Sequence, residues 1–258
     1  MSPAASHNQS AATVIIPARL GSTRFPEKVL ADRTGRPLVQ HVVDSVKAAA
    51  RAKLVCVATD SERVAAALAP FGTRVVMTSP DHPNGTSRLN EAAAVLGLAD
   101  DAVIVNAQGD EPEMQAAIID AALAALQDTP GASMGTVAAR FGPDEDPRDP
   151  NLVKVVRARD GRALMFSRSL IPFDRSGLGL DGARPLRHLG VYAYTRGFLA
   201  AYCAAEATPL EQTEQLEQLR ALEMGFAIGV HEVANAPQGI DTPAQYEAFV
   251  QRWKREHP

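Results

Sequence analysis

Residues 13–28, TVIIPARLGSTRFPEK, decide the fold. The first six residues form a short apolar run typical of a buried strand, and a polar turn follows directly. Similar runs alternate with longer alanine- and leucine-rich segments of helical spacing, which predicts an α/β fold with a mostly parallel sheet and crossover helices. We expect further strands at residues 53–59, 74–78 and 102–106, and helices at 37–51, 61–70, 86–97 and 115–127.

The second half of the chain is less regular. Strands are expected at residues 132–139, 152–158, 187–195 and 228–233, and a flexible loop is expected at 174–185, which is rich in Gly, Pro and Arg. Thr208-Pro-Leu-Glu and Thr242-Pro-Ala-Gln each match a capping box with proline at the first helical position, so a helix should begin at both. We expect a disordered tail at residues 1–11 and one domain at residues 12–258.

Composition restricts the class of protein. The 26 Lys and Arg against 30 Asp and Glu leave a net charge of -4, which argues against a protein that coats nucleic acid. The first residues lack the pattern of a secretory signal, and no apolar stretch approaches the roughly 20 residues that cross a bilayer. Two cysteines, Cys56 and Cys203, are too few for a disulfide framework. We expect a soluble, cytoplasmic protein that binds neither nucleic acid nor membrane.

The turn after the first strand suits a polyphosphate. It contains three cations and three small residues, namely Arg19, Gly21, Ser22, Thr23, Arg24 and Lys28. Backbone amides and hydroxyls donate to phosphate oxygens, arginine offers a bidentate fork and lysine a mobile point charge. The two generic nucleotide motifs, G-x-x-x-x-G-K-[ST] and G-x-G-x-x-G, do not match this turn. A solvated basic loop is the alternative, but the carboxyl end of a strand favours ligand binding.

Two more strand ends carry polar residues. Arg88 lies in residues 79–92, SPDHPNGTSRLNEA, where an ordinary turn and helix cap are the alternative. Asp110 ends residues 101–110, DAVIVNAQGD, and could hold Mg²⁺, which takes one or two protein oxygens beside substrate phosphates. Asp241 follows the last expected strand and is a candidate partner, although an Asp beside a helix start also favours the helix dipole. Spacing alone leaves this pairing open.

The second half offers polar candidates of a different kind. In residues 187–195, RHLGVYAYT, alternation predicts one face in the core and an opposite face with His188, Gly190, Tyr192 and Tyr194 that suits a hydroxyl-rich ligand. A structural histidine is the alternative. Arg168 could bind a carboxylate or lie on the surface. Glu214 is one of three glutamates at three-residue spacing, where a solvated acidic stripe is the alternative to cation or sugar binding.

Nine motifs occur in a characteristic order: IPARLGSTRFPEK, ATD, DHPNGTSRLNEA, VNAQGDEP, NLVKVV, FSRSLIPFDR, RHLGVYAYTRGFL, PLEQTEQLEQLRAL and GIDTP. In them the chain resembles the 3-deoxy-manno-octulosonate (Kdo) cytidylyltransferase family over nearly its whole length. The resemblance implies a Rossmann-like nucleotide-diphospho-sugar transferase fold with a sugar-binding and dimerisation insertion at about residues 160–205, and a homodimer. It also implies that CTP and Kdo react with Mg²⁺ to give CMP-Kdo and pyrophosphate for lipopolysaccharide synthesis.

The resemblance further implies roles for individual residues. The residues around CTP would be Arg19, Ser22, Thr23, Arg24, Lys28 and Arg88. Those around Kdo would be Gln108, Arg168, His188, Tyr192 and Glu214. The catalytic residues would be Lys28, Asp110 and Asp241, with the two aspartates as Mg²⁺ ligands. Two positions depart from the family pattern: Glu27 replaces a glycine of the first loop, and Gln212 stands where many relatives have His.

Three other functions compete with this interpretation. A cytidylyltransferase for 8-amino-Kdo or an acylneuraminate would share the fold, and only the resemblance favours Kdo. A glycosyltransferase with an Asp-x-Asp metal motif is disfavoured, because no such motif follows an expected strand. A nucleotide-binding relative without turnover has Glu27 as its only support, while Lys28, Asp110 and Asp241 argue against it.

Overall fold

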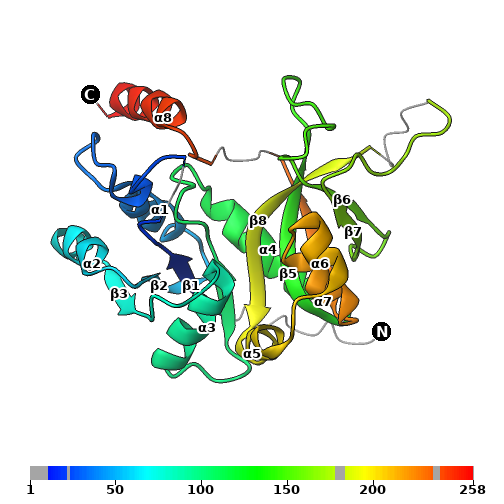
Figure 1. The fold of residues 1–258 in the computed structure, drawn as a ribbon, viewed down its shortest axis with the longest axis horizontal. Coiled ribbons are helices and arrows are strands. Elements are labelled where there is room, and N and C mark those ends of the chain that lie inside the picture. The colour runs from blue at the N-terminus through cyan, green and yellow to red at the C-terminus, as the bar shows by residue number, and fades with distance from the viewer. Residues whose placement is uncertain (1–10, 22–23, 178–183, 235–238, 258) are drawn as a thin grey trace, which may run out of the picture.

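The computed structural model describes residues 11–21, 24–177, 184–234 and 239–257 (Figure 1). Within them, nine strands form one mixed sheet: β1 (Ala12–Pro17), β2 (Ala52–Thr59), β3 (Arg74–Met77), β4 (Val103–Asn106), β5 (Ala132–Arg140), β6 (Lys154–Arg157), β7 (Ala163–Ser167), β8 (Leu186–Thr195) and β9 (Ala227–Val233). The main path runs β3-β2-β1-β4-β8-β5-β9. Neighbours along it are parallel except at β8, which is antiparallel to both β4 and β5. The predicted α/β class is confirmed.

Helices cover both faces of the sheet. They are α1 (Leu38–Val46), α2 (Glu62–Leu68), α3 (Gly85–Val95), α4 (Ala116–Asp128), α5 (Arg196–Ala204), α6 (Pro209–Glu214), α7 (Gln218–Glu223) and α8 (Pro243–Glu256), with 3₁₀ turns η1 (Lys28–Leu30) and η2 (Ala69–Phe71). Val14 and Ile16 of β1 pack with α1 and α4, whereas Ile15 packs with α3 on the opposite face. Burial on both faces explains why β1 reads as a continuous apolar run.

Helix α8 lies beside α1 and the first loop (Figure 1). Tyr246 and Phe249 of α8 form a cluster with Leu38 of α1, and Phe25 from the first loop packs against Tyr246 at a ring distance of 5.6 Å. Ile240, just before α8, donates its backbone N–H to the Asp110 carbonyl at 2.9 Å. The last part of the chain is thereby held beside the loops after β1 and β4.

The expected elements are present with small shifts at their ends, but β7 and the break in the helix after Pro209 were not predicted. β7 has one strand-favouring aromatic and no β-branched residue, so its sequence, ALMFS, carries a weak strand signal. The helix expected from Pro209 is two short helices, because Gln215 adopts a left-handed conformation with φ 53° and ends α6. Glu217 lies beyond the end of α6, and Glu211 is 8% exposed and paired with Arg220 at 2.6 Å, so the solvated stripe is wrong as an explanation of the three glutamates.

Strand β8 differs from the expected one-sided strand. Its register with β5 shifts between Thr136, which pairs with Tyr192, and Val137, which pairs with Leu189. On the face that was expected to be open to ligand, His188 is 9% exposed and packs edge-on against Phe166 at 4.9 Å. Tyr192 on this face is half-buried and Tyr194 is 2% exposed, so most of β8 is core on both sides.

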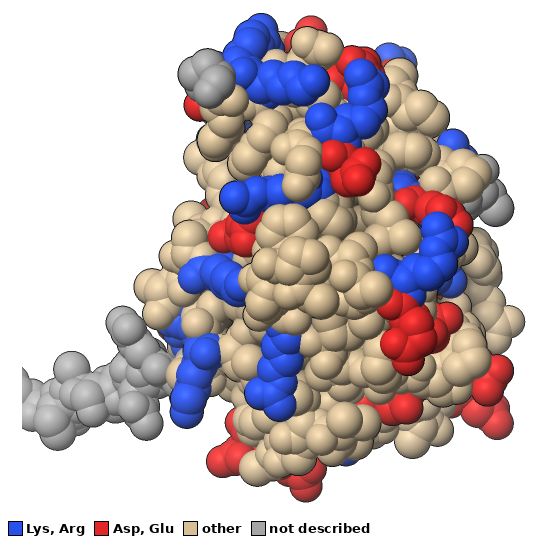
Figure 2. Space-filling view, turned by 90° about the vertical axis from the view of Figure 1, so that its left-hand side faces the viewer, with Lys and Arg blue, Asp and Glu red and all other residues tan. Residues whose placement is uncertain are grey.

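Two surface features complete the fold. On the face drawn in Figure 2, basic and acidic side chains of the described residues are interspersed rather than gathered by sign. Among the described helices none is both long and apolar enough to span a bilayer. Most of the expected N-terminal tail and residues 178–183 of the expected flexible loop lie outside the described residues.

Candidate active site

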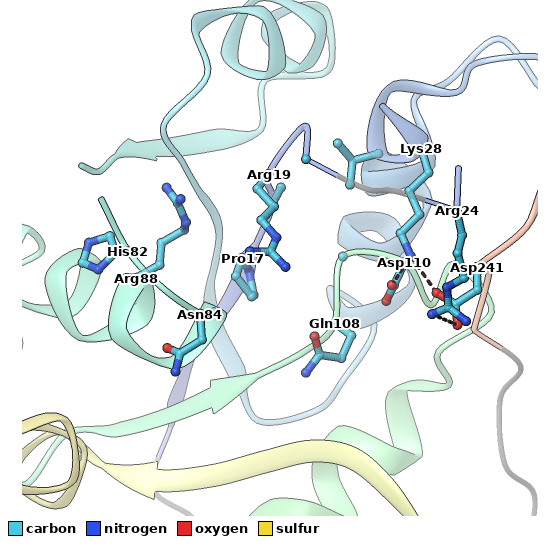
Figure 3. Close-up of a pocket in the computed structure, with 15 residues that line it drawn as sticks. Pro17, Arg19, Arg24, Lys28, His82, Asn84, Arg88, Gln108, Asp110 and Asp241 are labelled. Carbon is cyan, nitrogen blue, oxygen red and sulfur yellow. Dashed lines mark hydrogen bonds and ion pairs between the residues drawn. The ribbon is translucent and has the colours of Figure 1, made fainter. Parts of the chain in front are cut away.

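A cavity of about 400 Å³ opens where β1 and β4 end and α3 begins (Figure 3). Its lining comes from four separate loops: Pro17, Ala18, Arg19, Gly21, Arg24, Lys28, Val29, His82, Asn84, Gly85, Arg88, Gln108, Gly109, Asp110 and Asp241. Two glycines let these loops approach β1 closely. A Cβ on Gly109 would lie 2.8 Å from the Pro17 carbonyl oxygen, and one on Gly85 would lie 3.2 Å from Pro17 Cγ. Larger residues would push the loops apart.

Four cations face this cavity, and they differ in how they are held. Arg19 is exposed, and Arg24 forms an ion pair with Asp241 at 3.0 Å while remaining largely exposed. Arg88 is only 3% exposed. Its Nη1 donates to Thr78 Oγ1 at 2.6 Å and lies 3.1 Å from a carboxylate oxygen of Asp60. A buried guanidinium needs such partners. Ser22 and Thr23 lie outside the described residues.

Lys28 joins the two aspartates. Its Nζ lies 2.5 Å from Asp110 Oδ2 and 3.0 Å from Asp241 Oδ1, and donates to the Ile240 carbonyl at 3.0 Å (Figure 3). Burial lowers the pKa of Lys28, but the two carboxylates, Asp110 foremost, outweigh it and raise the pKa above its usual value. The ammonium is therefore charged at neutral pH, and the structure brings Asp110 and Asp241, whose pairing spacing left open, to one lysine.

The two aspartates fit the chemistry of Mg²⁺. Both approach one cation, from loops that the Ile240 to Asp110 backbone bond holds together. Among the described residues there is no group of three His, Cys, Asp or Glu side chains that could hold a metal unaided. A divalent cation at this pair would thus complete its coordination with water and substrate oxygens, which is how Mg²⁺ is usually bound.

Glu111 lies directly beside this pair. Burial, and next the charge of Asp110, raise the pKa of Glu111 to about 8. Its Oε2 is buried and accepts no hydrogen bond from any described residue. The carboxyl of Glu111 therefore keeps its proton to a higher pH than an exposed glutamate does.

His82 and Asn84 are lining residues that the sequence did not single out. His82 Nδ1 lies 3.2 Å from Ser87 Oγ, and its other ring nitrogen bonds to Glu91. Glu91 also accepts the Ser79 N–H at 2.9 Å. This network fixes the loop in front of α3. Because the loop follows the carboxyl end of β3, where ligand sites are expected, its polar residues could have been chosen as candidates from the sequence.

A second cavity of about 260 Å³ adjoins the first. It is lined by Asn151, Leu152, Val153, Arg187, His188, Gly190, Tyr192, Leu216 and Gln218. Gln108, which lines the first cavity, donates from Nε2 to the Gly190 carbonyl at 3.1 Å. The amide of Gln108 therefore marks the boundary between the two cavities.

His188 lines the second cavity with a neutral ring. Burial lowers the pKa of His188 to about 3, so the ring is neutral. Thr136 Oγ1 lies 2.7 Å from the Val191 carbonyl, which takes its single hydrogen, and 3.0 Å from His188 Nε2. This network assigns the proton to Nε2 and leaves Nδ1 of His188 as an acceptor.

Arg168 and Glu214 lie outside both cavities. Glu214 accepts from Ser167 Oγ at 2.6 Å and from the Arg168 backbone N–H at 2.9 Å. The Arg168 guanidinium donates to the carbonyls of Glu214, Pro150 and Gln215 at 2.7, 2.9 and 3.2 Å. The pair ties the segment after β7 to the end of α6, and a contact of either residue with Kdo stays a prediction.

The fold and this site together define a class of protein, the α/β nucleotidyltransferases. Cations for a polyphosphate and a carboxylate pair for Mg²⁺ meet at the carboxyl ends of parallel strands, where this class binds nucleotides. A sequence profile of the family described as Cytidylyltransferase matches residues 13–228.

Similar proteins of known name identify the family within this class. The chain is 46% identical to the 3-deoxy-manno-octulosonate cytidylyltransferase of Geobacter sulfurreducens, covering 94% of this chain and 99% of the relative. It is also 46% identical to the enzyme of that name from Herminiimonas arsenicoxydans, covering 90% of this chain and 94% of the relative. The chain belongs to the 3-deoxy-manno-octulosonate cytidylyltransferase family, as the motifs predicted.

Solved structures agree with this assignment. CMP:2-keto-3-deoxy-manno-octonic acid synthetase complexed with CTP superposes with a TM-score of 0.88 at 39% identity, covering 96% of this chain and all of that one. A 4-diphosphocytidyl-2C-methyl-D-erythritol synthase superposes with a TM-score of 0.62 at 14% identity, covering 94% of this chain and 97% of that one, and so shares the fold. The predicted Rossmann-like transferase fold is confirmed.

Proposed function

We propose that the chain is a cytoplasmic enzyme that transfers the cytidylyl group of CTP to Kdo and releases pyrophosphate. The observation that carries this proposal is the pair of adjoining cavities, one with four cations and two carboxylates and the other with hydrogen-bonding groups and the single cation Arg187. The names of the relatives and the CTP complex of the similar structure support it. Both cysteines are free, as is usual in a reducing compartment.

The proposed reaction is a direct in-line displacement. The anomeric oxygen of Kdo forms a bond to the α-phosphorus of CTP, the bond to the bridging oxygen breaks, and the hydroxyl proton passes to solvent. Lys28, Arg19 and Arg24 offset the charge that develops on pyrophosphate, and Arg88 binds the nucleotide from the opposite side of the cavity. Positioning and charge supply the catalysis, so no side-chain nucleophile is required.

Asp110 and Asp241 are the proposed holders of Mg²⁺. When bound, the ion neutralises phosphate charge and lowers the pKa of the attacking hydroxyl. Lys28 would then pair with a phosphate oxygen in place of at least one aspartate, because its ammonium now lies between the two carboxylates. This exchange keeps Lys28 paired in both states.

Kdo is proposed to bind in the second cavity, with its anomeric carbon toward Gln108. The Nδ1 acceptor of His188 and the hydroxyl of Tyr192 suit the hydroxyls of a sugar, and Arg187, which is paired with Glu145, could turn to a ligand carboxylate. Arg168 and Glu214 would join the site when the segment after β7 moves toward it. We therefore propose them as contacts of a closed state.

The second half is also proposed to contain the dimer interface, within one domain of residues 12–258. Leu164 on β7 is 62% exposed, and Leu170 and Phe173 in the segment that follows are 44% and 86% exposed. Large apolar side chains gathered in one exposed segment are typical of interfaces. The proposed dimerisation and sugar-binding insertion, about residues 160–205, includes all three.

Sedimentation tests the dimer. The unchanged protein should sediment as a dimer, and Leu164→Lys with Phe173→Glu should halve the mass without loss of helix content. Val95→Glu is a matched control, because Val95 is 63% exposed on α3. A monomer at all concentrations of the unchanged protein would contradict the proposed interface.

A pyrophosphate-release assay tests the function. The purified protein with Mg²⁺ and CTP should release pyrophosphate with Kdo, and the same mixture without sugar acid should not. Parallel reactions with 8-amino-Kdo and an acylneuraminate separate the alternatives, since release with one of these alone would identify a different sugar acid. No release with any of the three acids would refute the proposal.

A further inference from the structure

Glu27 occupies a demanding backbone position in the first loop. Its φ of 55° is left-handed, a conformation that glycine adopts freely and a glutamate does not. Its backbone N–H donates to the Leu20 carbonyl at 3.3 Å, and its carbonyl accepts from Leu30 at 2.9 Å. Glu27 thus closes the loop that begins after β1 and starts the turn that contains Lys28.

The side chain of Glu27 is held by α2 rather than by its neighbour Lys28. Arg63 Nη1 and Nη2 donate to the two carboxylate oxygens of Glu27 at 2.5 and 2.8 Å. Such a fork is the most directional ion pair available to proteins. Lys28 donates instead to Asp110 and Asp241. The negative charge that replaced a small residue in the loop is therefore neutralised from outside the cavity.

The segment 24–28 is consequently held from two sides. On one side Phe25 packs on Tyr246 of α8, and on the other Glu27 is tied to Arg63 on the first turn of α2. Both arginine and glutamate are exposed, with side-chain exposures of 62% and 48%, and Arg63 does not line the cavity. Any effect of Arg63 on a ligand in the cavity must pass through the loop.

We propose that Arg63 is a positioning residue for residues 24–28, the part of the first loop that we assign to CTP, and that it acts through Glu27. The bidentate pair holds Glu27 in its left-handed conformation and so keeps Lys28 aligned with Asp110 and Asp241. The proposal rests on the proposed function, because it assigns the loop to CTP. It makes Glu27 and Arg63 one unit, of which neither member has a role without the other.

A double-mutant cycle tests this unit. Arg63→Ala should raise the KM for CTP and the Kd from calorimetry by about threefold, the size expected of an exposed ion pair, while kcat changes less. In a Glu27→Gly background Arg63→Ala should have no further effect, because glycine adopts φ 55° without a partner. Arg63→Lys should restore part of the affinity, and 1 M salt should reduce the effect in the unchanged background.

The outcomes separate the inference from the function on which it rests. Arg148→Ala is the matched control, because Arg148 forms a similarly exposed pair with Asp146 at 3.0 Å outside the cavity, and it should leave the KM for CTP unchanged. An equal loss of CTP affinity from Arg63→Ala in both backgrounds would show that Arg63 acts without Glu27 and would overturn the inference. So would an unaltered KM in active protein. Absence of turnover in the unchanged protein would instead count against the proposed function.

Discussion

The two cavities are neighbours, yet they are built differently. In the first, residues from the loops after β1, β3, β4 and β9 converge, and Lys28 already joins Asp110 to Asp241. In the second, His188 and Tyr192 come from an antiparallel strand buried on both faces, and the predicted partners Arg168 and Glu214 are tied to each other instead. The charged residues of the first cavity are thus already in contact with one another, whereas only part of the residues predicted around the second cavity line it.

The difference shows when the direction of the strands helps to locate a binding site from the sequence. Parallel strands direct their carboxyl ends to one edge, so residues far apart in sequence meet there by the topology of the fold. β8 runs antiparallel to β4 and β5, so its residues are not gathered at that edge. At β8 the meeting of residues depends on a bulge and on loop conformation.

The largest expected effect concerns the first cavity. Asp110→Asn should lower kcat by about 1,000-fold, because it removes a charge needed only when the reaction proceeds, while CTP affinity changes by about threefold or less. Single-turnover pyrophosphate release and calorimetry measure the two quantities. Asp146→Asn, an exposed carboxylate distant in sequence, is the control. Normal turnover of Asp110→Asn with Mg²⁺ would remove Asp110 from the mechanism.

Arg88 tests whether the first cavity is also part of the core. Arg88→Met should lower the free energy of unfolding by about 2 kcal/mol, because Asp60 and Thr78 lose a buried partner, and should weaken CTP binding. Urea unfolding measures the stability. Adding Asp60→Asn should recover part of the stability but none of the affinity. Equal stability of Arg88→Met and the unchanged protein would show that the guanidinium serves the ligand alone.

Acid titration compares two buried histidines, His188 at the second cavity and His41 against α8. Burial lowers the pKa of His41 on α1 to about 4 and that of His188 on β8 to about 3, against 6.5 in an unfolded chain. The unfolded state therefore binds more protons below pH 6.5, so stability is complete above that pH and falls toward pH 4. Each histidine contributes a slope of up to about 1.4 kcal/mol per pH unit.

Urea midpoints at pH 7, 6 and 5 check this slope. His188→Gln should show a shallower fall of stability than the unchanged protein, because one of the two titrating groups is removed. Equal slopes in the two proteins would show that His188 is protonated to a similar extent in both the folded and unfolded states.

The smallest of these effects tests the role of the second cavity. His188→Gln should raise the KM for Kdo by about tenfold, the loss of roughly one hydrogen bond, and should leave the KM for CTP unchanged. Initial rates of pyrophosphate release with each substrate varied in turn measure both constants. Equal increases in both KM values would indicate that His188 supports the two cavities jointly rather than binding the sugar acid.

Much of the first region was predictable from the sequence and little of the second. The apolar runs at β1 and β4 located the strand ends where Lys28 and Asp110 lie, because a buried parallel strand is apolar on both faces. β7 and the break at Gln215 were not predictable in the same way. A five-residue strand with weak propensity and a left-handed glutamine depend on what packs around them.

By itself the sequence determined the α/β alternation, the family and the loop that ends β1, because periodicity, composition and ordered motifs are local properties of the chain. Only the tertiary structure decided which charges meet. In it Lys28 pairs with Asp110 and Asp241, and Glu27 forms its ion pair with Arg63 rather than with Lys28. Such contacts join residues that are tens or hundreds of positions apart, and their geometry is set by packing, which no local pattern encodes.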